Sequence, residues 1–212
     1  MESPGVAVVI PLFNHESYIV EAIRSVLSQS RPPDRLVVVD DGSTDNSLAA
    51  AERALNHAGP TQVELRVQSN RGTARTLNET ICSLDEAVIG ILNSDDVWAP
   101  NRLEILLPKL DMSGPSLVFS GVEFFGDSDQ EDLLSYPLVM ATSLHVGACL
   151  PSVGFTLLLK NIAVSTGNFL FTRQLHARIG GFDENLPGCH DWQFLIDTLP
   201  IVEPVVVPES LY

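Results

Sequence analysis

Val88-Ile89-Gly90-Ile91-Leu92-Asn93-Ser94-Asp95-Asp96 decides the fold class, because five apolar residues lead directly into a cluster of oxygen-bearing side chains. A short apolar run of this kind is typical of a buried strand, so segment 93–96 is expected at the strand's carboxyl end. Hard oxygen ligands bind divalent cations, and a bound cation can hold a diphosphate. The stretch therefore predicts a strand end that binds a metal and a nucleotide.

A second predicted strand, upstream, also ends in acidic residues. Leu36 to Val39 is almost entirely valine, and Asp40 and Asp41 follow it. Extended and helical patterns alternate around these two strands. This alternation predicts an α/β fold with a doubly wound, mostly parallel sheet, helices on both faces, and ligands at the carboxyl ends of the strands. Strands are predicted over 6–10, 36–39, 63–67 and 88–92, and helices over 18–27 (capped by Asn14 or His15), from the turn at 42–45 to about 57, and over 70–84.

The pattern is less regular after Pro100, but it still predicts ordered elements. Gly180 to Asp183 has the composition of a tight turn. No internal repeat or low-complexity linker divides the 212 residues, so a single domain is expected. Helices are predicted over 101–110 and 191–199, and strands over 117–124, 165–172 and 205–207.

Composition limits the classes of function. A formal net charge of −15 with two lysines argues against a nucleic-acid partner, which needs a basic surface. Three cysteines without a CxxC pair argue against a zinc site and for a reducing compartment. No basic segment precedes the strand at Val6, so no signal peptide is expected and the predicted location is cytoplasmic. The apolar stretch Leu138 to Phe171 is interrupted by polar residues and proline, so a membrane span is not expected, although membrane association stays an alternative.

The connection between the first predicted strand and helix excludes a common nucleotide site. A dinucleotide-binding fold places GxGxxG there, whereas this chain has Pro11-Leu12-Phe13-Asn14-His15. The lysine motif of P-loop nucleotide-binding proteins is absent as well. Phosphate is therefore expected at the acidic strand end, held through a metal.

Four segments together carry a family resemblance. Segments 8–14 (VVIPLFN), 38–45 (VVDDGSTD), 93–96 (NSDD) and 180–184 (GGFDE) resemble, in order and spacing, the signature of family 2 glycosyltransferases of the GT-A fold. The match covers nearly the whole chain. The resemblance implies inverting transfer of a sugar from a nucleotide-diphosphate donor, expected to be UDP-linked, to a hydroxyl of a glycan, lipid carrier or small molecule. It also implies a nucleotide-sugar-binding half over 1–100 and an acceptor-side half over 101–212.

The resemblance implies roles for residues on the donor side. Pro11 and Phe13 would border the nucleobase, with Glu16 nearby. Asp41 would bind the base, and Asp40 would support it or the ribose. Asp40 and Asp41 have the alternative of capping the next helix, and Arg75 that of a surface arginine. The residues implied to bind the nucleotide sugar are Pro11, Phe13, Glu16, Asp40, Asp41, Arg75, Asn93, Ser94 and Asp95.

The metal site implied by the resemblance is Asn93-Ser94-Asp95, at the position of the family's DxD motif. Asp95 would contact Mn²⁺ or Mg²⁺, and the metal would bridge the diphosphate. Asn93 is neutral where aspartate is common, so one formal charge is lost, and Asp96 is the residue that could compensate.

The resemblance places the catalytic base at Asp191, within His190-Asp191-Trp192. An inverting transferase needs a carboxylate that removes a proton from the acceptor hydroxyl. Asp191 has the alternative of a helix cap. His190 replaces the usual glutamate and would orient the acceptor or merely begin the helix. Trp192 would form an acceptor wall or pack in the core.

Two other functions stay open. A sugar nucleotidyltransferase would need a glycine-rich, basic loop, which segment 11–16 lacks. A non-catalytic module that binds a nucleotide sugar is compatible with Asn93, His190 and the end of the chain at Tyr212. The family's Tyr-Arg-x-His segment would follow that end, so a C-terminally truncated domain with little or no activity is expected. Acceptor specificity is expected in residues 125–165.

Overall fold

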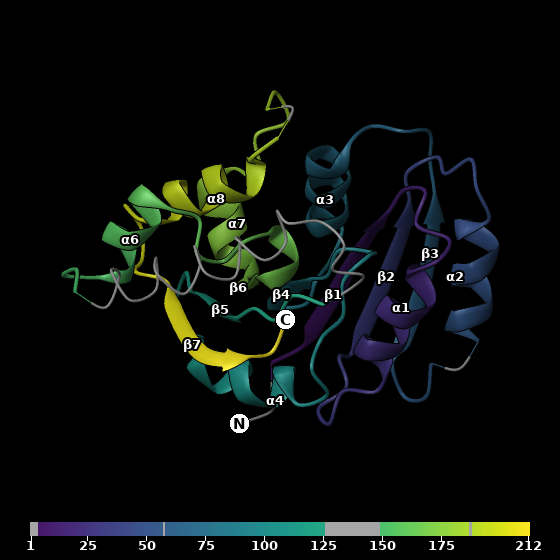
Figure 1. Ribbon diagram of the computed structural model, residues 1–212, viewed down its shortest axis with the longest axis horizontal. Coiled ribbons are helices and arrows are strands. Elements are labelled where there is room, and N and C mark those ends of the chain that lie inside the picture. Colours follow the sequence, from purple (N-terminus) through teal and green to yellow (C-terminus); the bar gives the residue numbers. More distant parts are fainter. Residues whose placement is uncertain (1–3, 57, 126–148, 187) are drawn as a thin grey trace.

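The computed structural model describes residues 4–56, 58–125, 149–186 and 188–212 (Figure 1). Most of the region 125–165, where acceptor specificity is expected, lies outside the described residues, as does the first part of the apolar stretch from Leu138. Within the described ranges, no helix combines the length and the apolar character needed to cross a bilayer.

One seven-stranded sheet forms the centre of the fold, in the order β3-β2-β1-β4-β6-β5-β7. Neighbouring strands are parallel except at β6, which runs antiparallel to both β4 and β5. The predicted doubly wound, mostly parallel sheet is therefore confirmed. The strands are β1 (Val6–Leu12), β2 (Arg35–Asp40), β3 (Gln62–Val67), β4 (Val88–Ile91), β5 (Leu117–Gly121), β6 (Leu170–Thr172) and β7 (Val205–Ser210).

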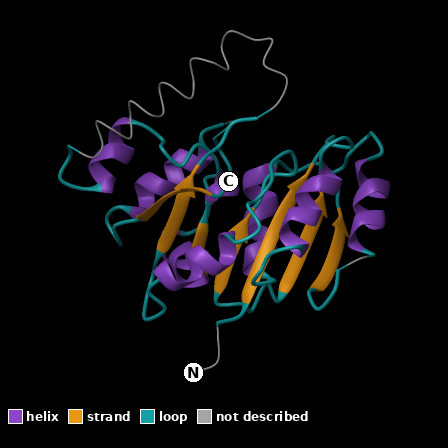
Figure 2. Ribbon diagram, turned by 60° about the horizontal axis from the view of Figure 1, so that its bottom comes forward, coloured by secondary structure: helices purple, strands orange, loops and turns teal. Residues whose placement is uncertain are grey.

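Helices cover both faces of this sheet, as Figure 2 shows. The helices are α1 (Ile19–Leu27), α2 (Ser47–Leu55), α3 (Thr73–Cys82), α4 (Arg102–Leu106), α6 (Val153–Leu159), α7 (Arg173–Ile179) and α8 (His190–Thr198), with 3₁₀ turns η1 (Leu107–Lys109) and η2 (Thr166–Asn168). Alternate residues of β1 point to opposite faces, as a strand requires. Val8 and Ile10 pack in the core with α1, α2 and α4, whereas Val9 packs in the core with α3, α6, α7 and α8. Both faces of the central strands are thus buried, which explains their valine-rich sequences.

Strand β1 continues through Pro11, although the sequence predicted that it ends before this proline. The pairing of β1 with β4 stops at Val9 and Ile91. Residues 9 and 11 face the same neighbouring strand, so the missing N–H of Pro11 falls beyond the last rung with β4. Pro11 therefore costs no ladder hydrogen bond and extends the strand toward the ligand edge.

Helix α1 begins without the predicted side-chain cap. Its N-cap residue is Tyr18, which makes no side-chain cap bond. Asn14 has a left-handed backbone (φ 54°), and the carbonyl of His15 accepts hydrogen bonds from the amides of Tyr18 and Ile19. The prediction of Asn14 or His15 as a cap was wrong because a backbone carbonyl turn organises this end of the helix.

The second half differs most from the prediction. The helix expected over 101–110 splits at Pro108 into α4 and η1, because proline lacks the N–H that a helix interior needs. The strand expected over 165–172 is η2 followed by the short β6. Asn168 stabilises this turn, since its amide donates to the carbonyls of Ser120 and Ala163. Helices α6 and α7 were not predicted.

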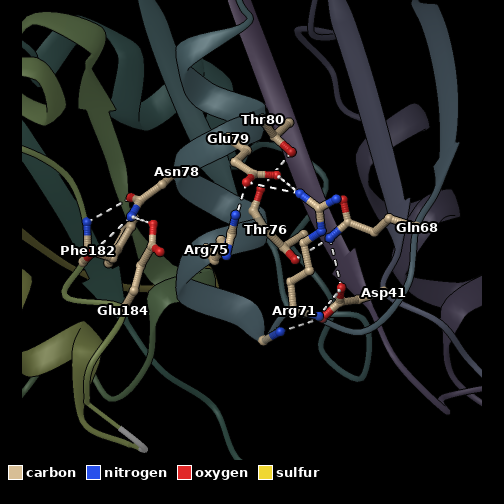
Figure 3. A network of polar contacts seen from close by, with 11 residues as sticks. Asp41, Gln68, Arg71, Arg75, Thr76, Asn78, Glu79, Thr80, Phe182 and Glu184 are labelled. Atoms are coloured by element: carbon tan, nitrogen blue, oxygen red, sulfur yellow. Dashed lines mark hydrogen bonds and ion pairs between the residues drawn. The ribbon is translucent and has the colours of Figure 1, made fainter.

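The predicted tight turn at Gly180 to Asp183 is present and joins the two halves of the fold. Gly180 and Gly181 have φ values of 93° and 91°. A Cβ at Gly181 would lie 2.5 Å from Oδ1 of Asn78 on α3. That Oδ1 accepts a hydrogen bond from the amide of Phe182 at 2.8 Å, and Nδ2 of Asn78 donates to the carbonyl of Phe182 at 2.9 Å (Figure 3). Glycine is required here because the turn packs directly against α3.

Candidate active site

The carboxyl ends of β1, β2 and β4 border one cavity of about 450 Å³. Ligands of open parallel sheets bind at this edge, where neighbouring strands end together. The amino end of α8 and the turn before β6 complete the wall. The lining residues are Pro11, Leu12, Phe13, His15, Asp41, Thr73, Asn93, Ser94, Asp95, Ser165, Thr166, His190 and Asp191. The structure thus brings together most, but not all, of the residues expected at the site.

Asn93 joins the end of β4 to the turn before β6. Its Nδ2 donates to the hydroxyl of Ser165 at 3.0 Å and to that of Tyr212 at 3.3 Å. Its Oδ1 accepts from the hydroxyl of Thr166 at 3.2 Å. An aspartate could not donate these two bonds, so the neutral amide has a structural use at this position.

Asp95 is the most accessible acid at this strand end, with its side chain 47% exposed. Its Oδ1 lies 3.9 Å from Nδ1 of His15. The same Nδ1 lies 2.7 Å from the hydroxyl of Ser94, within hydrogen-bond distance. His15 was missed by the sequence analysis as a site residue, because it was treated as a helix cap.

Asp96 is turned away from this cavity and toward Tyr212. The Tyr212 hydroxyl donates to the Asp96 carboxylate, and Asp96 lines a second cavity of about 400 Å³ that shares Asp95 and Ser165 with the first. Burial raises the pKa of Asp96, and the nearby Asp95 charge raises it further. Burial and the Asp96 carboxylate together hold the pKa of Tyr212 well above its usual value, so the phenol remains a proton donor.

Arg102 lies beneath Tyr212 as a fully buried guanidinium. Its carbon atom Cζ lies 5.0 Å from the ring centroid of Trp98 and 5.8 Å from that of Tyr212. It donates to the hydroxyl of Ser120 at 2.6 Å and to Oδ1 and the carbonyl of Asn168 at 2.8 Å. Burial lowers the pKa of Arg102 to about 9, so the side chain stays charged at neutral pH. Arg102 was not predicted as a buried residue, because it precedes the apolar residues of a short helix and resembles an ordinary surface arginine there.

Asp41 faces the cavity and organises the loop between β3 and α3. Its Oδ1 accepts from Nε2 of Gln68 at 2.7 Å and from the amide of Arg71 at 2.8 Å. Its Oδ2 accepts from the amide of Gly72 at 2.8 Å. Asp40 is also buried, accepts from the amide of Ser43 at 3.3 Å, and does not line the cavity.

The remaining donor-side residues divide into two groups. Pro11 and Phe13 line the cavity, and Phe13 is 44% exposed, as an open aromatic wall would be. Glu16 and Arg75 do not line it. Glu16 accepts from the amide and side chain of Asn46 before α2, and Arg75 pairs with Glu79 at 2.9 Å on the surface of α3 (Figure 3).

Asp191 lies in the first turn of α8 and lines the cavity. Its Oδ2 accepts from Nδ2 of Asn161 at 2.8 Å. The N-cap residue of α8 is Cys189, so Asp191 does not cap this helix. His190 begins the helix beside it, and burial lowers the pKa of His190 while the Asp191 charge opposes that shift. Trp192 donates from Nε1 to the carbonyl of Leu157 at 2.7 Å, so it packs against α6 and not on the cavity wall.

The described side chains alone do not complete the coordination of a divalent cation at this strand end, so a bound ligand would have to supply part of it. Among the described residues, no group of three or more histidine, cysteine, aspartate or glutamate side chains could hold a metal alone. Asn93 is hydrogen-bonded at both ends of its amide, and Asp96 accepts from Tyr212, whereas Asp95 is open to the cavity. One carboxylate suits a Mn²⁺ or Mg²⁺ ion whose other ligands are phosphate oxygens and water.

Known proteins of similar sequence include glycosyltransferases. A sequence model described as "Glycosyl transferase family 2" matches residues 7–179. An uncharacterized glycosyltransferase of Nostoc sp. is 30% identical over 125 residues, which are 59% of this chain and 38% of that protein. The glycosyltransferase GlyG of Streptococcus pneumoniae is 28% identical over 124 residues, which are 58% of this chain and 41% of that protein. The chain spans only about two fifths of the length of these relatives.

Solved structures share the fold. S. aureus TarS 1–349 in complex with UDP has a TM-score of 0.71 and 20% identity, covering 98% of this chain and 59% of that one. The mannosyltransferase PcManGT from Pyrobaculum calidifontis, in complex with GDP-Man and Mn²⁺, has a TM-score of 0.70 and 20% identity, covering 98% and 56%. At this identity the likeness shows the GT-A fold alone.

Proposed function

Because this chain belongs to glycosyl transferase family 2, we propose that it transfers a sugar from a nucleotide-diphosphate sugar to a hydroxyl acceptor. The observation that carries the proposal is a single cavity lined by Phe13, Asp41, Asp95 and Asp191. An aromatic wall, two acids at strand ends and a further carboxylate in the same cavity are the groups that this reaction needs. Residues 1–100 would bind the donor, and residues 101–212 would form the acceptor side.

On the donor side, the nucleobase would lie against Pro11 and Phe13, with Asp41 at its polar edge. Asp41 is held by three donors of the β3–α3 loop, so its carboxylate is fixed before the ligand arrives. The complexes of the related folds contain UDP in one case and GDP-Man in another. We propose a UDP-linked donor, with GDP as the competing base to be tested.

The diphosphate would lie near Asp95. A bound Mn²⁺ or Mg²⁺ would neutralise the charge that develops on the leaving diphosphate. Asp95 would hold that cation, and Asn93 would keep Ser165 and Thr166 in place beside it. Because the protein offers one open carboxylate here, the site should bind the metal firmly only together with the nucleotide.

On the acceptor side, Asp191 would act as the general base. It would take the proton of the acceptor hydroxyl as the acceptor oxygen forms its bond to the anomeric carbon. The bond from that carbon to the diphosphate breaks, and the electron pair leaves with the diphosphate. Attack from the face opposite the leaving group inverts the anomeric centre. His190, next to Asp191 on the cavity wall, would contact the acceptor.

A non-catalytic module that binds a nucleotide sugar is the second candidate. It is favoured by the engaged state of Asn93 and Asp96, which leaves Asp95 as the accessible carboxylate of segment 93–96. Such a module would bind the donor but would not depend on Asp191.

The experiment has a binding arm and a turnover arm. We expect UDP to raise the Tm of the chain, Mn²⁺ to enhance that rise, and Asp95→Ala to abolish the enhancement. Asp191→Asn should leave UDP affinity unchanged and remove transfer, with Asp197→Asn, an exposed position on the same helix, as the matched control. Full turnover by Asp191→Asn would refute the base. A failure of UDP, GDP and dTDP alike to raise Tm would refute the donor class.

A further inference from the structure

The segment 161–168, which we call the 161–168 turn, makes hydrogen bonds to both sides of the candidate active site. At its start, Asn161 donates to Asp191 at 2.8 Å. Further along, Ser165 and Thr166 are hydrogen-bonded to Asn93 at the end of β4. One short segment therefore contacts the proposed base and the proposed metal-binding strand end.

The amide orientation of Asn161 is fixed by its surroundings. Its Oδ1 accepts from the amides of Ala163 at 3.2 Å and Val164 at 3.1 Å, and only an oxygen can accept from two N–H groups. Its Nδ2 is then the donor end of the amide, and it donates to Oδ2 of Asp191 at 2.8 Å and to the carbonyl of Val164 at 3.4 Å. Within the described residues, the side chain of Asp191 makes no other hydrogen bond, so its second oxygen remains available to a ligand in the cavity.

The backbone next to Asn161 has an unusual conformation. Val164 has φ 73°, a left-handed value that is rare for a β-branched residue. Such a conformation persists only where surrounding contacts impose it, and these outliers cluster at active sites. Here the two hydrogen bonds that Asn161 Oδ1 accepts impose it from one side, and Asn168 donates to the carbonyl of Ala163 at 3.1 Å from the other.

We infer that Asn161 is a positioning residue, which holds one oxygen of Asp191 so that the other oxygen faces the acceptor hydroxyl. This inference rests on the proposed transfer reaction for its consequence, but the geometry that it describes can be tested without turnover. Loss of the Nδ2 donor frees the Asp191 side chain to rotate, and a misplacement of about 1 Å in a reacting group costs about 100-fold in rate. This loss should appear in kcat and not in the donor KM, because Asn161 does not line the cavity of the candidate active site.

A purely structural role for Asn161 is the competing explanation. In that case Asn161 serves only to keep Val164 in its left-handed conformation. Glycine adopts this conformation without strain, so Val164→Gly removes the need for that restraint. The double variant Asn161→Ala/Val164→Gly therefore separates the two roles, because the backbone is relieved while the bond to Asp191 stays absent.

The first readout is kinetic. We expect Asn161→Ala to lower kcat about 10- to 100-fold, with the donor KM and the UDP Kd within about twofold of the original values. Adding Val164→Gly to Asn161→Ala should not restore kcat. Asn185→Ala, which removes an asparagine bonded to Asp183 in an exposed turn, is the control and should change neither parameter.

The second readout is a crystal structure of Asn161→Ala/Val164→Gly, which needs no activity. A rotated Asp191 carboxylate supports the inference, and an unmoved carboxylate overturns it. Recovery of kcat on adding Val164→Gly would also overturn it. Full turnover by Asp191→Asn itself would instead overturn the proposed base, so failure of the inference and failure of the proposed function are distinguishable.

Discussion

Asp41→Asn tests the idea that a buried carboxylate fixes the β3–α3 loop at the cavity edge. The substitution keeps the shape of the side chain and replaces one oxygen by an NH₂ group. Asp41 is 4% exposed, and three N–H groups converge on it. If the remaining oxygen faces Gln68 and the amide of Arg71, the new NH₂ faces the amide of Gly72, and two donors oppose each other.

The magnitude follows from these three bonds. Losing the bond at Gly72, made to a charged acceptor, costs about 1.5–3 kcal/mol. The other two bonds change from a charged to a neutral acceptor, which weakens each by roughly 1 kcal/mol. Some relaxation of the loop offsets part of this, so we expect a loss of about 3 kcal/mol in the free energy of unfolding, a large fraction of the roughly 5–15 kcal/mol typical of a domain.

Urea denaturation followed by circular dichroism measures this loss, with Asp111→Asn as the control. Asp111 is an exposed acid whose Oδ1 accepts both of its side-chain hydrogen bonds, from the amide and hydroxyl of Ser113, and an asparagine oxygen can keep them. The control should not move the midpoint beyond experimental error. A loss below about 1 kcal/mol for Asp41→Asn would refute the reasoning, because the three bonds would then not be holding the loop.

Three further outcomes are expected. Burial lowers the pKa of His176 to about 4, below its unfolded value of about 6.5, so the unfolded chain binds more protons between these pH values. Up to about 3 kcal/mol of the free energy of unfolding is therefore lost as the pH falls from 6.5 to 4. Urea midpoints measured at several pH values should show this dependence, and His176→Gln should remove most of it. A Cβ at Gly167 would overlap the Tyr212 hydroxyl, so Gly167→Ala should cost about 1–3 kcal/mol by overpacking. Thermal melts should show Tyr212→Phe relieving part of this loss. Mn²⁺ should bind weakly alone and at least about tenfold more tightly with UDP present, because Asp95 supplies only one carboxylate and the diphosphate oxygens would supply further ligands. Equal Mn²⁺ affinities with and without UDP, measured by titration calorimetry, would contradict this.

The parts of the fold that were predictable are those with local signals. Apolar runs end in acids at Asp40 and at segment 93–96, and the structure places both strand ends at one edge of the sheet. The glycine pair at 180–181 was predictable for the same reason, since a left-handed backbone needs no distant partner to be recognised.

The parts that were not predictable depend on contacts between distant residues. Asn93 and Tyr212 are 119 residues apart, and no local pattern indicates that their side chains are bonded. The contact of Asn161 could not be predicted for the same reason, because its partner Asp191 lies 30 residues away in the sequence. Arg75 is a different case, because its partner Glu79 is only one helical turn away on α3, but the prediction for Arg75 followed the family pattern instead of this local pair.

The reversed direction of β6 has a consequence for how this fold can vary. In an antiparallel pair, the entry to one strand lies beside the exit of the other, so whatever precedes β6 arrives next to the acids that follow β4. A parallel strand at that place would deliver its preceding loop to the opposite rim. Insertions or exchanges just upstream of residue 170 can therefore reshape the pocket mouth while leaving every rung of the β3-β2-β1-β4 ladder intact.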